Sequence, residues 1–256
     1  MPRLASWILV MFLVEGASRP GEAAPPSAVD SAAAPRSLVS SRDLWFGLAA
    51  SAGIVATFQA DPRVREKALE SRSRMRGLAK AAEHLGNPLY VGSALALVYF
   101  SAGRLGHREA QVAADHIGGA ILAAGLACEV LKVAVGRPRP EQDAGEHDRA
   151  RPFSSFNSFP SGHATVAFAA AAALDHESRA AWVPWVAYPL AGLVGWSRVH
   201  DDRHWASDVV AGAALGTWVG AKASILEDRI AARHAGLHLT LTPLGRGLGA
   251  GLQTRF

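Results

Sequence analysis

The sequence has little of several features that define common protein classes. Its 256 residues include a single cysteine, Cys128, so the chain forms no internal disulfide, and this residue is a small core side chain rather than a nucleophile. The formal charge is +4, but there is no long block of Lys and Arg of the kind that binds nucleic acid. No cluster of Asp and His residues in the sequence has the pattern of a Mg²⁺ or Zn²⁺ site, and we expect neither a metal nor another cofactor. The excess positive charge instead favours anionic substrates or lipid headgroups.

The N-terminus has the pattern of an export signal. Arg3 precedes an apolar run over residues 4–14, which is short for a membrane span, and small residues follow it. We predict a signal peptide over residues 1–23, cleaved after Ser18 or Ala23; an uncleaved anchor is the alternative. Residues 24–42 are rich in Pro, Ala and Ser and are typical of a linker.

The main part of the chain, residues 43–226, is predicted to be one all-α domain. Six apolar segments rich in Ala, Leu and Gly predict about six core helices, over residues 44–58, 88–102, 117–135, 163–174, 182–196 and 209–225. The charged stretch between the first two predicts a separate, exposed amphipathic helix that stops at Gly86 or at the following Asn87–Pro88 pair. Residues 227–256 form a tail whose alternating leucines predict a short β-hairpin.

Two questions about this domain stay open at the level of sequence. The apolar runs are mostly shorter than the roughly 20 residues of a membrane span, so a soluble bundle and a membrane-embedded bundle both fit, and the all-round apolarity favours the membrane. The polar segment from Glu141 to Phe159 is long for a loop inside a domain. It is either a lid over a site or a solvated linker.

Two short motifs indicate an anion site. Lys132 and Arg139 lie in KVAVGRPRP, where Gly136 and Pro138 should end the third helix, although basic residues often simply close a helix. The sequence PSGH, from Pro160 to His163, directly precedes an apolar helix. Free N–H groups at a helix start bind anions, Gly162 permits close approach, and His163 is placed to move a proton. An ordinary helix capped by Ser161 is the alternative.

A third motif, SRVHDDRHWASD, supplies a nucleophile. His204 and Asp208 are four residues apart and share one face if a helix begins here. A carboxylate that accepts from one ring nitrogen leaves the other free to attack, and Arg198 can bind a phosphoryl group bidentately. A structural hydrogen bond between His204 and Asp208 is the simpler alternative.

Together the three motifs resemble the signature of the type 2 phosphatidic acid phosphatase (PAP2) superfamily, K-x6-R-P, PSGH and S-R-x5-H-x3-D, in the same order and with the same internal spacing. The resemblance covers about residues 43–226 and implies a helical bundle. It also implies that His204 is the nucleophile, oriented by Asp208, and that His163 protonates the leaving alcohol and later activates water. The residues implied to bind the phosphate are Lys132, Arg139, Ser161, Gly162 and Arg198.

The resemblance implies a metal-independent phosphatase that forms a phosphohistidine on phosphate monoesters or lipid pyrophosphates. Lipid-linked substrates and a membrane-associated protein with its site outside the cytoplasm are favoured. A soluble, broad-specificity acid phosphatase of the periplasm is the next alternative. The superfamily also includes vanadium haloperoxidases, and a non-enzymatic phospholipid-binding protein is the least favoured alternative. The oligomeric state and the substrate chain stay undetermined.

Overall fold

The computed structural model describes residues 38–142, 148–178, 180–235, 237–244 and 247–254. The predicted signal peptide and most of the linker therefore lie outside the described residues. The described part contains six helices followed by two strands: α2 (Ser41–Gly86), α3 (Pro88–Leu105), α4 (Arg108–Val135), α5 (Gly162–Glu177), α6 (Val183–His200), α7 (Ala206–Ala235), β1 (Leu237–Leu244) and β2 (Gly247–Thr254). This confirms the predicted all-α bundle, and the two strands pair antiparallel as a terminal hairpin.

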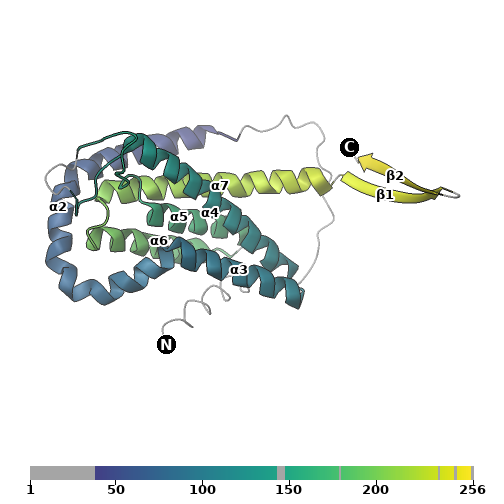
Figure 1. The fold of residues 1–256 in the computed structure, drawn as a ribbon, viewed down its shortest axis with the longest axis horizontal. Coiled ribbons are helices and arrows are strands. Elements are labelled where there is room, and N and C mark those ends of the chain that lie inside the picture. Colours follow the sequence, from purple (N-terminus) through teal and green to yellow (C-terminus); the bar gives the residue numbers. More distant parts are fainter. Residues whose placement is uncertain (1–37, 143–147, 179, 236, 245–246, 255–256) are drawn as a thin grey trace.

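Helix α2 differs from the prediction of two helices. Its apolar first part and its charged second part form one helix of 46 residues, with Pro62 inside it. Figure 1 shows α2 curving around one end of the bundle, and an internal proline, which removes one backbone hydrogen bond, is a common cause of such a bend. The charged part is not simply exposed, because Asp61, Ala79, Ala82 and Gly86 are buried. The predicted stop is confirmed, since Asn87 caps the helix.

Helix α5 is the central helix and packs against α4, α6 and α7. Its alanine-rich sequence suits this position, because small side chains let neighbouring helices approach closely. The approach is tightest at α7, where a Cβ atom built on Gly216 would lie 2.3 Å from the carbonyl oxygen of Thr165. Gly212 and Gly220, one turn away on either side, would meet the α5 backbone in the same way. The start of α5 and the start of α7 are thereby held at a short, fixed separation.

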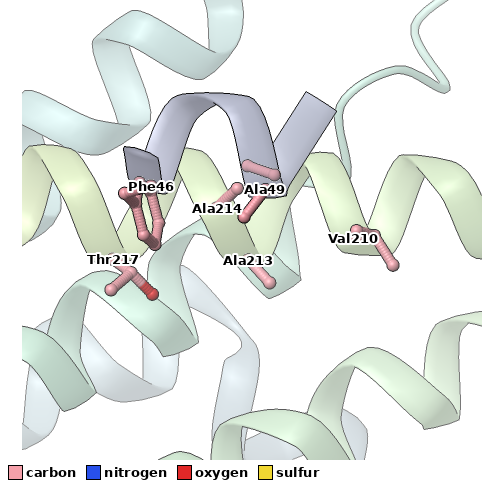
Figure 2. A pocket seen from close by; sticks show the side chains of 7 residues that line it. Phe46, Ala49, Val210, Ala213, Ala214 and Thr217 are labelled. Atoms are coloured by element: carbon pink, nitrogen blue, oxygen red, sulfur yellow. The ribbon is translucent and has the colours of Figure 1, made fainter. Parts of the chain in front are cut away.

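The bundle exposes many large apolar side chains, mainly on the first part of α2, on α3 and on α4. Leu122, Leu126 and Val130 follow each other at four-residue spacing on α4 and are each about 70% exposed. Figure 2 shows a shallow apolar groove between α2 and α7, lined by Phe46, Ala49, Ala50, Val210, Ala213, Ala214 and Thr217. Among the described residues, α4 and the Ala206–Ile230 part of α7 are long and apolar enough to cross a membrane, and the bent pair α2–α3 would make a third span. These features support membrane association.

Candidate active site

The three sequence motifs meet at one end of the bundle, the end that α2 curves around (Figure 1). Lys132 lies in the last turn of α4, and Ser161, Gly162 and His163 form the start of α5. Arg198 lies in the last turn of α6, His204 lies in the short connection to α7, and Asp208 lies in the first turn of α7. Helix ends from four different elements thus bring together residues that are far apart in the sequence.

Local sequence explains why α4 stops where it does. Gly136 adopts a left-handed conformation with φ of 59°, and its N–H donates to the carbonyl of Lys132, which closes the helix as predicted. A side chain at this position would collide with the carbonyl oxygen of Arg151. The chain then returns through buried Arg137 and Pro138 towards the site. Lys132 is consequently fixed with its ammonium group beside Gly162, 3.2 Å from where a Cβ atom of that glycine would lie.

His204 is buried, but its hydrogen bond differs from the predicted one. Its Nδ1 lies 2.8 Å from the backbone carbonyl oxygen of Ser158 and 3.7 Å from Oδ2 of Asp208, which is too long for a hydrogen bond. The carbonyl can only accept, so Nδ1 carries the proton and Nε2 is left with a free lone pair. Asp208 is therefore close enough to act electrostatically on the ring, but the direct acceptor is Ser158.

Asp208 is held by four donors. Its Oδ2 accepts from Ser158 Oγ at 2.5 Å and from the backbone N–H of Trp205 at 2.9 Å. Its Oδ1 accepts from Nη1 of Arg137 at 2.6 Å. In addition, the backbone carbonyl of Asp208 accepts from the N–H of Ser161, which ties the PSGH segment to α7. Ser158 thus bridges the pair, since its hydroxyl binds Asp208 while its carbonyl binds His204.

The cations of the site each have a side-chain partner in the structure. Lys132 Nζ lies 2.6 Å from Glu129, and Nη1 of Arg198 lies 2.8 Å from Glu83 of α2. Arg139 donates from Nε to Asn157, at 3.1 Å. The neighbouring loop is also tied down, because Arg203 pairs with Glu141. Ser158 and Asn157 come from the segment Glu141–Phe159, so the end of that segment lines the site and is not a solvated linker.

Several polar atoms of the motifs are buried without a hydrogen-bond partner among the described residues. They include Oγ of Ser161, Nε2 of His163 and Nε of Arg198. Ser161 is at the N-cap position of α5 as predicted, but its side chain makes no capping bond, which leaves the hydroxyl free. Buried polar groups are satisfied in most proteins, and an unsatisfied group needs an explanation. An anion bound between these atoms would supply one.

The surroundings of His163 and His204 lower the pKa of both rings. Burial, together with the nearby charges of Arg198, His204 and Lys132, lowers the pKa of His163 to about 4. Burial also lowers the pKa of His204, helped by Arg139 and Arg198 and opposed by Asp208. Both rings are neutral near pH 7, as a nucleophile requires. The same interactions show that Arg139, Arg198 and both histidines lie in one electrostatic neighbourhood.

Four residues of this end of the bundle were missed by sequence reasoning: Asp61, Glu83, Arg137 and Ser158. Ser158 and Arg137 lie inside or next to motifs that were recognised, at positions where the signature accepts any residue. Asp61 and Glu83 belong to α2, which was predicted as a helix without a role in the site. Only the pairing of distant segments reveals them, although the Asp61–Pro62 break at the end of an apolar run marks a polar position worth testing.

Comparison with known proteins finds relatives of the part of the chain that carries the motifs. Residues 115–229 match the model of the PAP2 superfamily. The lipid A 1-phosphatase of Porphyromonas gingivalis is 37% identical over 118 residues, which are 45% of this chain and 24% of that protein. The lipid A 1-phosphatase of Rhizobium johnstonii is 39% identical over 133 residues, which are 49% of this chain and 50% of that protein. The chain thus spans between a quarter and half of these relatives.

The fold has a counterpart among solved structures. The transmembrane PAP2 type phosphatidylglycerolphosphate phosphatase of Bacillus subtilis superposes with a TM-score of 0.53 at 24% identity, covering 73% of this chain and 94% of that one. This likeness concerns the fold. The matched segment carries all three motifs, from Lys132 to Asp208, and through this segment the chain is similar to the PAP2 superfamily.

Proposed function

We propose that this protein is a metal-independent phosphatase that cleaves lipid-linked phosphate monoesters or pyrophosphates through a phosphohistidine on His204. The observation that carries the proposal is the set of buried, unpartnered polar atoms on Ser161, His163 and Arg198. They surround the start of α5, where backbone N–H groups and the helix dipole add further attraction for an anion. A phosphate group placed there would meet all of them at once.

The reaction would proceed in two balanced steps. Nε2 of His204 attacks phosphorus with its lone pair while the bond from phosphorus to the leaving oxygen breaks, and that oxygen takes a proton from His163. A water molecule then attacks the phosphohistidine, gives its proton to His163 and releases inorganic phosphate, which restores His204. Asp208 would stabilise the positive charge that develops on the His204 ring.

Charge explains how this chemistry could run without a metal. Phosphoryl transfer depends mainly on positioning and on stabilising the charge of the equatorial oxygens. Lys132, Arg139 and Arg198 would supply three positive charges, and the fork of an arginine matches two phosphate oxygens at once. A bound dianion would also raise the low pKa of His163, so that substrate itself prepares the general acid.

Lipid-linked substrates are favoured over soluble ones. The bundle exposes large apolar side chains and contains helices long enough to cross a membrane, so the site would open near the lipid headgroups. Two relatives are named lipid A 1-phosphatases, which makes a glycolipid phosphate a suitable first probe. The predicted signal peptide favours export, and we place the site on the extracytoplasmic side of the membrane as part of the proposal.

The test uses the full chain purified in detergent. Phosphate release is measured from lipid A, phosphatidic acid and a prenyl pyrophosphate, and from p-nitrophenyl phosphate as a soluble comparison, with and without EDTA. We expect activity on at least one lipid, insensitivity to EDTA, and loss of turnover by more than about a thousandfold in His204→Ala. With radiolabelled substrate, an acid-labile, base-stable label should be trapped on the wild-type chain and be absent from the variant.

Other results would point elsewhere. Activity on p-nitrophenyl phosphate alone would identify a broad-specificity phosphatase. Halide oxidation on adding vanadate and peroxide, without phosphate release, would identify a haloperoxidase. Binding of the lipids without any turnover or label would overturn the enzymatic proposal altogether.

A further inference from the structure

A chain of buried charges connects helix α2 to the start of α7. Arg137 donates from Nη2 to Oδ2 of Asp61 at 2.8 Å and from Nη1 to Oδ1 of Asp208 at 2.6 Å. The three side chains are each at most 4% exposed. Charged groups are rarely buried this completely unless they are paired, because each loses its hydration. The sequence signature gives neither Asp61 nor Arg137 a role.

Ser207 locks this chain of charges to the backbone of α7. Its N–H donates to Oδ1 of Asp61 at 2.9 Å, and its hydroxyl donates to Oδ2 of Asp61 at 2.6 Å. Arg137 Nη1 also donates to the same hydroxyl, at 2.7 Å. Asp61 therefore accepts the first-turn N–H of α7 from a different helix. The position of α7, and with it the position of Asp208, is set partly by a residue of α2.

The net charge of Asp61, Asp208 and Arg137 affects His204 as well as their geometry does. Asp208 paired with one arginine alone would form a neutral couple, and its field at His204 would be largely cancelled. Asp61 shares the same guanidinium, so the set of two carboxylates and one arginine carries a net charge of −1. The second negative charge leaves part of the Asp208 charge available to the His204 ring, which lies 3.7 Å away.

We propose that Asp61 and Arg137 are positioning residues that hold the Asp208 carboxylate in place and keep it electrostatically active towards His204. The inference rests on the proposed function of the site. Neither side chain is assigned a contact with substrate. Asp61 also lies outside the matched segment 115–229, so a helix beyond that segment would complete the catalytic centre.

A double-mutant cycle tests whether Asp61 acts through Asp208. The variants are Asp61→Asn, Asp208→Asn and the double variant, all made in the full chain. Asparagine at position 61 is nearly isosteric and can still bind Ser207, so it removes charge while disturbing packing little. We expect Asp61→Asn to lower kcat about tenfold, as the loss of an outer-shell partner typically does, with the inhibition constant of phosphate changed less than about twofold.

In the Asp208→Asn background the same substitution should lower kcat by less than about twofold, because the group it acts through is already gone. Arg137→Lys provides a second variant: the ammonium keeps the charge but lacks the planar fork whose two ends contact the two carboxylates, so kcat should fall while phosphate binding persists. The matched control is Asp43→Asn, since Asp43 also joins α2 to α7 through an ion pair, with Lys222, but does not touch Asp208. Its kcat should equal that of the wild type.

The outcomes separate the two levels of the argument. Equal losses of kcat from Asp61→Asn in both backgrounds, or a loss of phosphate binding that matches the loss of kcat, would overturn the positioning role. An unchanged kcat in both Asp61→Asn and Arg137→Lys would overturn it too. If the wild type hydrolyses none of the probes, the proposed function fails and this inference fails with it.

Discussion

Helices α4, α5 and α7 carry polar groups at both ends, and the two ends are built differently. At the end away from the site, His116 lies 2.8 Å from Glu177, and His176 lies 2.8 Å from Asp228. These side chains are between 17% and 57% exposed. At the site end, charged groups such as Asp208 are almost completely buried, and several donors have no partner among the described residues.

The difference distinguishes ion pairs that stabilise the fold from polar groups that are available to bind a ligand. Partly exposed ion pairs are already satisfied and contribute little, because water competes for them. Buried, unpartnered donors cost free energy in the folded protein and are retained where a ligand completes them. Among the described residues, the end with Ser161, His163 and Arg198 therefore has the character of an anion site, whereas the buried unpartnered atom at the far end, Oε2 of Glu227, is an acceptor. Three experiments test this difference between the two ends.

The largest effect is expected from the planar fork of Arg198. Replacing Arg198 by Lys keeps the positive charge but loses bidentate geometry, so inhibition by vanadate, which resembles the five-coordinate transition state, should weaken at least about tenfold. Phosphate inhibition should weaken less. Arg65→Lys is the control, because Arg65 makes a bidentate pair with Asp202 and is not one of the predicted phosphate-binding residues. Equal losses for both anions, or for both variants, would contradict the assigned role.

A smaller effect is expected from the protonation of His163. Burial lowers its pKa to about 4, and a dianion beside it should raise that value, so anion binding takes up a proton. Inhibition by sulfate should therefore tighten as pH falls from 7 to 5, by at most about tenfold per pH unit for one linked proton. The dependence should shrink in His163→Gln, with a residual part from His204. An identical slope in both proteins would remove His163 from the site.

The smallest effect is expected at the far end. Glu177→Gln removes the partner of His116, and we expect kcat to be unchanged and the unfolding temperature to fall by no more than about 4 °C, because the pair is partly exposed. Measuring activity and thermal unfolding in detergent checks both. A large loss of activity would mean that the two ends are coupled and that the contrast drawn above is wrong.

The helices could be predicted because their cause is local. Runs of Ala, Leu and Gly between Gly and Pro breaks define α3 to α7, and the left-handed Gly136 ends α4 where the sequence indicates. The motif residues could also be located, because their spacing is a property of the chain. The continuity of α2 could not be predicted, since a proline inside a helix usually interrupts it, whereas Pro62 does not end α2.

The hydrogen-bond and ion-pair partners that lie far apart in the sequence could not be predicted. The His204–Asp208 spacing suggested a direct bond, but the carbonyl of Ser158, 46 residues away, is the acceptor. Asp61 and Arg137 are separated by 76 residues and meet only because α2 folds across the end of the bundle. Pairings between distant segments depend on how helices pack, and no local pattern specifies that packing.

Three glycines on one face of α7 determine how closely α7 can approach α5. His163 and Asp208 stand on two different helices, and the gap between those helices is as small as backbone contact permits, because Gly212, Gly216 and Gly220 carry no side chains. One added methyl group at Gly216 would collide with the backbone of α5 and push apart the two helices that carry His163 and Asp208. The separation of the helices that carry His163 and Asp208 is in this sense set by three positions that have no Cβ atom.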